Sequence, residues 1–466
     1  MHDDKPRDAC GVFGIYAPGE DAARLTFFGL YALQHRGQES AGIATSNGKK
    51  ISVRTRLGLV GQAFAEDDLE DLPGGTAIGH ARYSTAGSNK ICNAGPLVAD
   101  SPLGPIAVSH NGNLVNAAPL RRELEERGER FVTSTDSEVL TRMIAAAPGN
   151  DLPTKIRRAM GRMIGAFSLT VLTRDSLYAV RDPLGVRPLC LGRLGPHWVV
   201  ASESCALSTI GAVYEREVEP GEIVEIDGDG MRSHGAGMPR PHAMCLFELI
   251  YFARPDSLIH DQRLHLVRQR MGEELAREHP VDADVTVGLP DSATPAAIGY
   301  ARASGIPYQE ALIKNRYIGR TFIQPTQRLR ETGVSLKFNA LPEVLAGRRV
   351  ILVDDTIVRG TTSRPIVQLL RQAGATEVHM RVHAPPMVSP CYLGVDLAKK
   401  EDLIAANLSV PEIGRFIGVD SIGYLSLDGL MRAVAVPGEG FCTGCLTGAY
   451  PVPVQLGMDK LLLERV

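Results

Sequence analysis

The stretch RVILVDDTIVRGTTS, residues 349–363, decides the fold of the second half of the chain. Its run Val350–Val353 is β-branched and aliphatic, which is typical of a strand buried on both faces of a parallel sheet. Two adjacent carboxylates, Asp354 and Asp355, end that run. We therefore expect an α/β domain in which these carboxylates lie at the carboxyl end of a parallel strand, where such sheets bind their ligands.

The loop after the carboxylates has the composition of a phosphate site. It contains Gly360, Thr361, Thr362 and Ser363, and Ser363 is placed to cap a helix that ends at Gly374. The stretch has neither of the glycine-rich patterns typical of nucleotide triphosphatases and dinucleotide folds. Hydroxyls and backbone N–H groups bind phosphate, and paired carboxylates accept hydrogen bonds from a vicinal diol, so a ribose 5-phosphate fits best.

This stretch resembles the loop with which the type I phosphoribosyltransferases bind phosphoribosyl pyrophosphate (PRPP). An ordinary strand-to-helix turn with solvated acids is the alternative. The resemblance implies that PRPP is bound by the loop residues and by one lysine outside the loop, namely Asp354, Asp355, Thr356, Gly360, Thr361, Thr362, Ser363 and Lys337.

A second strand-and-turn pattern comes earlier in the chain. Residues 284–287 are strand-like, a turn with Ser292 follows, and a helix is expected over residues 294–305. Because two such strand ends in one sheet lie side by side, backbone N–H groups near Ser292 would hold a pyrophosphate with its Mg²⁺, next to Asp354 and Asp355. A plain loop is the alternative for this turn.

Two further segments of the second half have a clear pattern. Residues 263–277 place apolar side chains on one face, which predicts a helix. The segment Lys314–Lys337 carries several lysines and arginines with little apolar rhythm, which by itself is typical of a solvated face. Beside a polyanion site we expect this segment to be a lid that orders over pyrophosphate and excludes water.

Length and composition limit the class of protein. The chain has 466 residues, enough for two or three domains, and its 44% hydrophobic and 22% charged residues are globular values. A formal charge of -3 argues against a general nucleic-acid or membrane-surface binder, and no apolar run is long enough to span a bilayer. We expect a soluble, cytoplasmic protein whose eight cysteines are reduced thiols or serve catalysis or metal binding, rather than forming disulfides.

The first half contains a cysteine followed by four polar, glycine-punctuated clusters. Cys10 begins an apolar strand, and the clusters cover residues 31–42, 79–87, 110–113 and 135–138. Together they resemble the glutaminase domain of the class II, N-terminal nucleophile glutamine amidotransferases. The resemblance implies an α+β domain with αββα layers over residues 10–235, joined by a linker at residues 233–241 to a phosphoribosyltransferase domain at residues 242–466.

The same resemblance assigns roles in the first domain. The leader, residues 1–9, is removed so that the free α-amine of Cys10 acts as the base for its own thiol. Asn111 and the backbone N–H of Gly112 form the oxyanion hole, Arg82 pairs with the α-carboxylate of glutamine, and Asp136 pairs with its α-ammonium. The mechanism leaves His80 and His110 a structural role.

The order of motifs in both halves resembles the glutamine PRPP amidotransferase family over nearly the whole chain. The resemblance implies that glutamine, PRPP and water give 5-phosphoribosylamine, that purine nucleotides such as AMP, GMP, ADP and GDP inhibit, and that the assembly is a homotetramer. Two rivals remain: another class II amidotransferase, such as a sugar-phosphate aminating enzyme or asparagine synthetase, and a PRPP-sensing regulator with an inactive site.

Four of the cysteines are candidate metal ligands, and their spacing alone fits either zinc or a [4Fe-4S] cluster. The resemblance favours the cluster, because the branch of this family with a cleaved leader carries a [4Fe-4S] cluster on cysteines at these positions. The expected ligands are Cys245, Cys391, Cys442 and Cys445.

Overall fold

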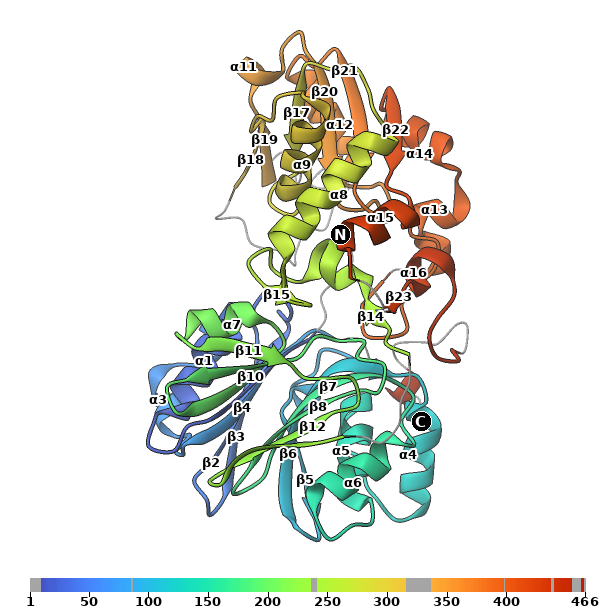
Figure 1. The fold of residues 1–466 in the computed structure, drawn as a ribbon. Helices are drawn as coiled ribbons and strands as arrows, with labels where there is room; N and C mark the ends of the chain where they lie inside the picture. Colours follow the sequence, from blue (N-terminus) through green and yellow to red (C-terminus); the bar gives the residue numbers. More distant parts are fainter. Residues whose placement is uncertain are drawn as a thin grey trace.

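The computed structural model describes residues 10–84, 87–235, 241–315, 337–397, 399–436, 440–454 and 462–464. They form two domains, drawn in blue to green at the bottom of Figure 1 and in yellow to red at the top. The predicted linker lies largely outside the described residues, as do the leader and most of the predicted lid. Among the helices that the structure describes, none is both long and apolar enough to cross a membrane.

The first domain contains two antiparallel sheets packed face to face. The seven-stranded sheet has the order β11-β9-β10-β1-β4-β2-β3, and the six-stranded sheet has the order β13-β12-β8-β7-β6-β5. The first sheet consists of β1 (Gly11–Tyr16), β2 (Ser40–Ser46), β3 (Ile51–Leu57), β4 (Thr76–Arg82), β9 (Cys190–Leu194), β10 (His197–Ala201) and β11 (Val213–Glu217). The second consists of β5 (Leu97–Ser101), β6 (Gly104–Leu114), β7 (Gly165–Leu172), β8 (Leu177–Arg181), β12 (Ile223–Asp227) and β13 (Gly230–His234).

Helices cover the outer face of each sheet. The first sheet packs against α1 (Ala22–Ala32), α2 (Val60–Ala63), α3 (Glu66–Glu70) and α7 (Ser204–Thr209). The second packs against α4 (Ala117–Glu126), α5 (Asp136–Ala146) and α6 (Leu152–Met160), and a single 3₁₀ turn, η1 (Ile91–Asn93), precedes β5. Because β1 is buried on both faces, Val12 packs between the sheets while Phe13 packs under the helices, so its sequence is a continuous apolar run. The predicted αββα layers are confirmed.

The second domain is built on a four-stranded parallel sheet with the order β17-β20-β21-β22. Its strands are β17 (Val285–Gly288), β20 (Arg349–Asp354), β21 (Glu377–Val382) and β22 (Ser421–Tyr424). Its longer helices are α8 (Leu264–Glu278), α9 (Thr294–Ser304), α12 (Ser363–Gln372), α14 (Val410–Ile417) and α15 (Leu427–Val434). The run that the sequence predicts to be a doubly buried strand is therefore an inner strand, β20, and the parallel α/β fold is confirmed.

Short elements complete the second half of the chain. They are the strand pairs β14 (Met244–Cys245) with β23 (Phe441–Cys442), β15 (Leu258–Ile259) with β16 (Gln262–Arg263) and β18 (Leu312–Lys314) with β19 (Phe338–Ala340), the π-helix η2 (Glu248–Phe252), the 3₁₀ turns η3 (Lys400–Asp402) and η4 (Leu462–Glu464), and the single-turn helices α11 (Pro342–Leu345), α13 (Ile404–Asn407) and α16 (Gly444–Thr447).

The predicted helices are present, with one difference at a cap. α8 lies where the apolar periodicity places it, α9 lies within the residues expected to be helical, and Gly374 has the positive φ of +96° expected just after α12. Ser363, however, is the first residue of α12 and not its cap. The N-cap is Thr362, whose backbone is already helical and whose side chain makes no capping hydrogen bond, so the loop enters the helix one residue earlier than predicted.

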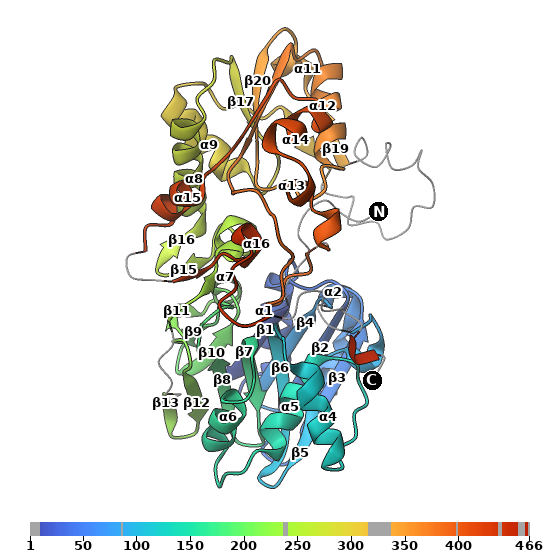
Figure 2. The same cartoon turned by 90° about the vertical axis from the view of Figure 1, so that its right-hand side faces the viewer.

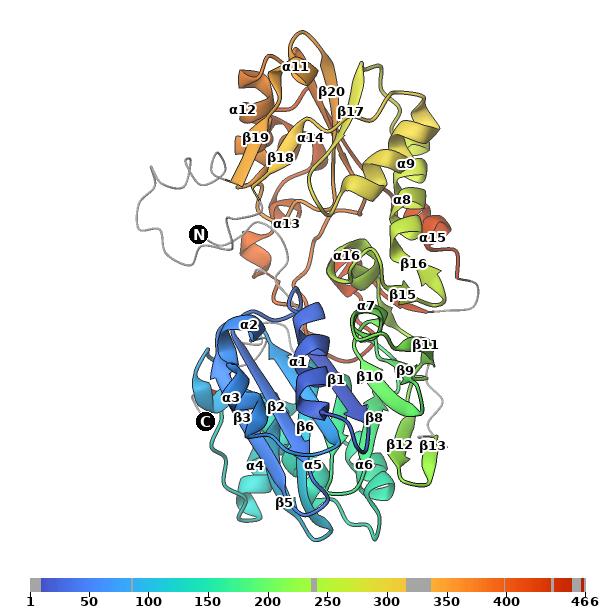
Figure 3. The same cartoon turned by 90° about the vertical axis from the view of Figure 1, so that its left-hand side faces the viewer.

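The two domains share part of one apolar core. Ala166, Leu184 and Val186 of the first domain pack into the same cluster as the second domain's core. Backbone hydrogen bonds cross the junction, from Cys245 N to Val186 O at 3.0 Å for example. The short helix α16 lies at this junction in every view (Figure 1, Figure 2 and Figure 3). The last described turn, η4, packs against the first domain through the buried Leu463.

Candidate active sites

Cys10 lies at the entrance of β1 and is only 7% exposed. Its thiol donates to the carbonyl oxygen of Tyr83 over 3.3 Å, and its own carbonyl oxygen accepts from Arg36 Nε at 3.2 Å. Burial raises the pKa of the Cys10 thiol, and the Tyr83 hydrogen bond and the charge of Arg82 offset only part of that rise. The thiol is therefore protonated at neutral pH, and it needs a base before it can attack a substrate.

Asn111 and Gly112 lie on β6, in the sheet that faces β1 across the sandwich. The Asn111 side chain is fully buried, and neither its amide nitrogen nor its amide oxygen has a hydrogen-bond partner among the described residues. Leaving a buried amide unpaired is costly, so this side chain has the properties of a group that awaits a ligand. Gly112 has φ +149°, and a Cβ there would lie 2.0 Å from Ala166 O, so only glycine fits.

The two residues predicted to grip the amino-acid end of glutamine lie near the thiol. Arg82 ends β4 and Asp136 begins α5. Both are close enough to shift the pKa of Cys10, Arg82 downward and Asp136 upward. Arg82 Nη1 lies 3.8 Å from Glu39 Oε2, and Asp136 Oδ2 accepts from the backbone N of Leu114 at 2.9 Å. The structure therefore brings Cys10, an arginine and a carboxylate from three distant motifs together.

Two buried histidines flank this region. Burial lowers the pKa of His80 to about 3, and it also lowers the pKa of His110. His110 is hydrogen-bonded to Ser137 Oγ at 3.0 Å and to Ala166 O at 3.4 Å. Both rings are neutral at pH 7, which agrees with the structural role predicted for them.

In the second domain, the ends of two parallel strands lie side by side as predicted. β17 pairs with β20, with Gly288 opposite Val353. Asp354 and Asp355 follow that position and are both buried. Asp354 Oδ1 accepts from the backbone N of Asp355 at 2.8 Å, and Asp355 Oδ1 accepts from Thr356 Oγ1 at 2.9 Å.

The loop that follows these carboxylates is packed tightly enough to select glycine. Gly360 has φ +74°, and a Cβ there would lie 2.9 Å from Ile404 Cδ1 and 3.0 Å from the Phe416 ring. The loop then runs into α12, so its hydroxyls and backbone N–H groups lie at a helix start at the carboxyl end of the sheet. This geometry suits a phosphate group.

The ends of the predicted lid meet beside the second strand end. β18 and β19 are antiparallel, and Asn315 N donates to Lys337 O at 2.9 Å. Lys314 Nζ lies 2.6 Å from Asp291 Oδ2, in the turn that contains Ser292 and precedes α9. Residues 316–336 lie outside the described residues, so the structure places the base of the lid and not its body.

The four candidate ligand cysteines lie in one neighbourhood at the domain junction. Cys245 and Cys442 are register partners in the parallel pair β14–β23, Cys445 lies in α16, and Cys391 Sγ accepts from Leu393 N at 3.4 Å. Burial raises the pKa of Cys245 to about 11 and that of Cys442 to about 12. As they stand, no three His, Cys, Asp or Glu side chains of the described residues could hold a single metal ion.

Comparisons with known proteins agree with this geometry. Residues 80–209 match the model of a glutamine amidotransferase domain family. The amidophosphoribosyltransferase of Synechocystis sp. is 53% identical, over 100% of this chain and 96% of the relative, and that of Mycobacterium tuberculosis is 46% identical over 99% and 90%.

A solved structure from B. subtilis, described as glutamine PRPP amidotransferase complexed with ADP and GMP, is 45% identical with a TM-score of 0.91 and covers 97% of this chain and 99% of that one. Another, described as the allosteric regulatory enzyme of purine biosynthesis, is 46% identical with a TM-score of 0.91 and covers 98% of both chains. This chain belongs to the amidophosphoribosyltransferase family. It is a transferase that acts in the first step of purine biosynthesis.

A buried ion-pair network, which the sequence reasoning missed, joins the two domains of this amidophosphoribosyltransferase chain. Arg36 Nη1 lies 2.5 Å from Glu203 Oε1, and Arg36 Nη2 lies 2.6 Å from Glu248 Oε1. Arg187 Nη1 reaches the same Glu248 oxygen at 3.1 Å. Glu248 begins the π-helix η2 of the second domain, while its arginine partners belong to the first. No local sequence pattern predicts such a network, because its members are far apart in the sequence.

Burial raises the pKa of Glu203, but the charges of His35 and Arg36 outweigh it and hold that pKa well below its usual range. The carboxylate is therefore ionised in the folded protein. Because Arg36 also donates to the Cys10 carbonyl, this network supports the nucleophile from behind.

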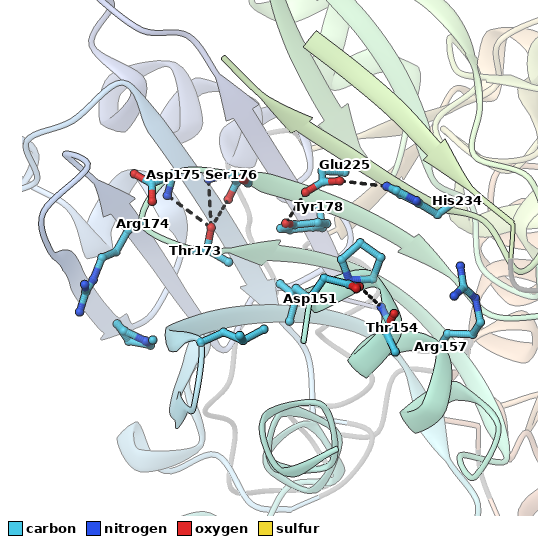
Figure 4. A pocket seen from close by; sticks show the side chains of 15 residues that line it. Asp151, Thr154, Arg157, Thr173, Arg174, Asp175, Ser176, Tyr178, Glu225 and His234 are labelled. Atoms are coloured by element: carbon cyan, nitrogen blue, oxygen red, sulfur yellow. Dashed lines mark hydrogen bonds and ion pairs between the residues drawn. The ribbon is translucent and has the colours of Figure 1, made fainter. Parts of the chain in front are cut away.

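A surface cavity of about 520 Å³ lies elsewhere on the first domain of this amidophosphoribosyltransferase chain. Figure 4 shows its polar lining, in which Glu225 accepts from Tyr178 Oη at 2.7 Å and lies 2.9 Å from His234 Nε2. None of the predicted site residues lines it. The cavity therefore lies apart from the residues predicted for the family's chemistry.

Proposed function

We propose that this chain makes 5-phosphoribosylamine, glutamate and pyrophosphate from glutamine, PRPP and water. The observation that carries the proposal is the pairing of two sites in one molecule. In the first domain, a buried cysteine lies near an arginine and a carboxylate, and the buried Asn111 amide on the facing sheet has no hydrogen-bond partner among the described residues. Two buried carboxylates lie before a glycine-constrained loop at the end of a parallel strand in the second.

In the first half-reaction, Cys10 attacks the carboxamide of glutamine. Arg82 pairs with the α-carboxylate of glutamine and Asp136 pairs with its α-ammonium. Simple amides lack these charged groups and are therefore rejected. The oxyanion that develops is stabilised by Asn111 and the backbone N–H of Gly112, and each such donor is typically worth about 10² to 10³ in rate. Ammonia leaves, and water then releases glutamate from the thioester.

The base for this step is the α-amine of Cys10 after removal of residues 1–9. Its pKa of about 7.7 to 8 lies close to that of a free thiol, so it can accept the thiol proton at neutral pH. Burial raises the pKa of the Cys10 thiol, which makes a base at this position more necessary. Intact-mass measurement of the active protein tests the point: full activity with Met1 still attached would require another base.

In the second half-reaction, PRPP is held by its ribose diol and its 5-phosphate. Asp354 and Asp355 accept hydrogen bonds from the diol, while the loop Thr356–Ser363 binds the phosphate with its hydroxyls and N–H groups. Ser292 and the two aspartates would hold Mg²⁺, which would supply positive charge to the leaving pyrophosphate. Magnesium takes most of its ligands from phosphates and water, so a site with few protein ligands fits it. Lys337 and the cationic side chains of the lid supply further positive charge to the pyrophosphate.

Ammonia released in the first half-reaction is used in the second without leaving the protein. Ammonia freed into neutral water is mostly ammonium, which has no lone pair, so the gas must pass to the PRPP site along a sheltered apolar path. The continuous apolar core at the domain junction supports this arrangement.

We propose further that Cys245, Cys391, Cys442 and Cys445 hold a [4Fe-4S] cluster. The donor set consists of four thiols, and burial raises the pKa of Cys245, Cys442 and Cys445, so a bound metal group would have to stabilise their thiolate forms. The four thiols are neighbours, and together they would supply the four-cysteine ligand set that a [4Fe-4S] cluster takes. Arg187 supplies a buried positive charge beside two of these cysteines. The cluster's role is structural, because neither half-reaction moves an electron.

Purine nucleotides, namely AMP, GMP, ADP and GDP, are the proposed feedback inhibitors. The B. subtilis relative was solved with ADP and GMP, and both carry the ribose phosphate that the PRPP loop would recognise. We also propose a homotetramer in the cytoplasm.

The experiment that tests the proposal is PRPP-dependent release of glutamate from glutamine, with Cys10→Ala beside the parent. The parent should release glutamate and form pyrophosphate together, whereas Cys10→Ala should form pyrophosphate only when ammonia is supplied. A PRPP-sensing regulator would release no glutamate, and another class II amidotransferase would release it without consuming PRPP. Loss of the ammonia-dependent reaction in a folded Cys10→Ala protein would contradict the two-site scheme.

A further inference from the structure

Three residues of the second domain, Tyr392–Gly394, lie against the oxyanion strand of the first. Asn113 Nδ2, one residue beyond Gly112 on β6, donates to Tyr392 O at 2.9 Å. Arg187 Nε and Nη2 donate to Leu393 O at 3.1 and 2.9 Å. Leu393 and Gly394 are buried. The chain segment is therefore fixed to the glutaminase domain by three hydrogen bonds to its backbone.

Gly394 touches Gly112 directly, backbone to backbone. A Cβ at Gly394 would lie 2.8 Å from both the Cα and the carbonyl carbon of Gly112, and the backbone there has φ +101°. On its other side, Gly112 has no room for a Cβ because Ala166 O would lie only 2.0 Å away. Gly112 is thus held between β7 of its own sheet and a residue of the other domain.

We propose that Tyr392–Gly394 is the wall that fixes the oxyanion hole, so that the second domain supplies part of the glutaminase's geometry. The proposal rests on the proposed roles of Asn111 and Gly112. An oxyanion hole stabilises charge only if its donors are aimed before the reaction begins, and a displacement of a few tenths of an ångström at Gly112 would misalign its N–H. Gly394 is a positioning residue in this scheme, since it touches Gly112 and not the substrate.

Contacts within the second domain hold the wall, Tyr392–Gly394, in place. The rings of Tyr392 and Tyr450 pack edge to face with centroids 5.2 Å apart, and the Tyr450 hydroxyl donates to Pro390 O. Cys391, a proposed cluster ligand, immediately precedes the wall and accepts a hydrogen bond from Leu393 N. The wall therefore cannot retreat from Gly112 unless these contacts are broken.

Gly394→Ala tests the proposal, with Gly305→Ala as the matched control. Gly305 also has a positive φ, +76°, but a Cβ there meets nothing within 4 Å, so the control carries the backbone strain of alanine without the contact. We expect Gly394→Ala to lower kcat for glutamine hydrolysis by at least about 10-fold, since loss of one oxyanion donor costs about 10² to 10³. The KM for glutamine and the ammonia-dependent reaction should stay close to those of Gly305→Ala.

A binding measurement separates misalignment from general damage. The Cys10 thiol adds to the aldehyde carbon of glutamate γ-semialdehyde. The C=O π pair moves to the oxygen, which then takes the thiol proton. Formation of this adduct therefore depends on the oxyanion hole. Glutamate makes no such adduct. Gly394→Ala should weaken inhibition by the semialdehyde by about the same factor as kcat, while inhibition by glutamate stays unchanged.

Asn113→Ala carries the test if Gly394→Ala does not fold. It removes one anchor of the wall without adding a clash, and the same pattern is expected with a smaller loss. The proposed role of Tyr392–Gly394 would be overturned if Gly394→Ala and Gly305→Ala had equal kinetics and equal inhibition by the semialdehyde. It would also be overturned if Gly394→Ala weakened inhibition by glutamate and by the semialdehyde equally. A separate result, unchanged semialdehyde inhibition in Asn111→Ala, would instead overturn the assignment of the oxyanion hole itself.

Discussion

Burial keeps His80 uncharged beside the glutaminase site. The side chain is 3% exposed, and burial, assisted by the charge of Arg82, lowers its pKa to about 3. In the unfolded chain the same ring has a pKa of about 6.5. Between these two values the unfolded chain binds a proton that the native protein does not, so stability rises with pH across that window.

We therefore expect the free energy of unfolding to fall as the pH drops below about 6.5, by up to about 1.4 kcal/mol per pH unit from this residue alone. His80→Gln should lose that part of the slope, because glutamine does not titrate. His197→Gln, at a partly exposed position, serves as the control. Urea unfolding measured between pH 4 and 7 gives the slopes, and an identical slope in His80→Gln and the parent would contradict the account.

Glu248 is the residue on which the buried charges of both domains converge. It is fully buried and accepts from Arg36 and Arg187, and Arg36 in turn holds the Cys10 carbonyl. Breaking a buried ion pair by removing one partner typically costs about 3 to 5 kcal/mol, because a charge is left buried without compensation. We expect Glu248→Gln to lower the free energy of unfolding by a few kcal/mol and to reduce glutamine-dependent turnover more than ammonia-dependent turnover.

Asp282→Asn is the matched control for Glu248→Gln. Asp282 also pairs with an arginine, Arg349, at 2.6 Å, but its side chain is 87% exposed, so solvent screens the pair. Thermal unfolding and both turnover assays decide the comparison. Equal Tm shifts in the two variants would show that the buried network adds no more stability than a surface pair.

Elements in which one local signal dominates were predictable from the sequence, and elements set by distant contacts were not. β20 has an unbroken apolar run because both of its faces are buried in the core of the second domain, and α8 has an apolar face. The start of α12 was misplaced by one residue, because Ser363 is a good cap by composition while the packing of the loop at Gly360 decides where the helix begins.

The candidate sites divide in the same way. Local motifs in the sequence were sufficient to identify Cys10, Arg82, Asn111 and Asp136. The fold then brings the Cys10 thiol near both charged residues. The network at Glu248 and the contact of Gly394 with Gly112 have no such signal, since Glu248 lies 61 residues from Arg187 and 212 from Arg36, and Gly112 is also distant from Gly394 along the chain.

The strand end at Asp354 and Asp355 gives a prediction for the PRPP site. Hydrogen bonds to charged groups are worth about 1.5 to 3 kcal/mol each, so Asp354→Asn and Asp355→Asn should lower kcat/KM for PRPP by about 10- to 100-fold. Hydrolysis of glutamine should remain chemically competent. Asp402→Asn, which pairs with Arg359 of the same loop but is exposed, is the control and should change PRPP use little. Unchanged PRPP kinetics in both variants would remove these aspartates from the site.

At the scale of the whole molecule, the domain junction is the feature on which both half-reactions depend. The apolar core continues across it and a buried ion network crosses it. β14, β23 and α16, which carry three of the four cysteines, lie beside it (Figure 1). The cysteines come from segments up to 200 residues apart, so whatever binds them ties the start of the second domain to its C-terminal segment.

The last prediction concerns that tie. Protein purified without oxygen should be brown and contain iron and sulfide, whereas Cys391→Ala should lose iron and unfold at a lower temperature. Because Cys391 directly precedes the wall at Tyr392–Gly394, Cys391→Ala should also weaken inhibition by glutamate γ-semialdehyde, a readout that needs neither PRPP nor turnover. Cys92→Ala, at an exposed thiol outside the group, should change none of these properties. A colourless, fully active preparation with zinc or without metal would refute the cluster, and a Cys391→Ala protein that keeps its iron would remove this cysteine from the ligand set.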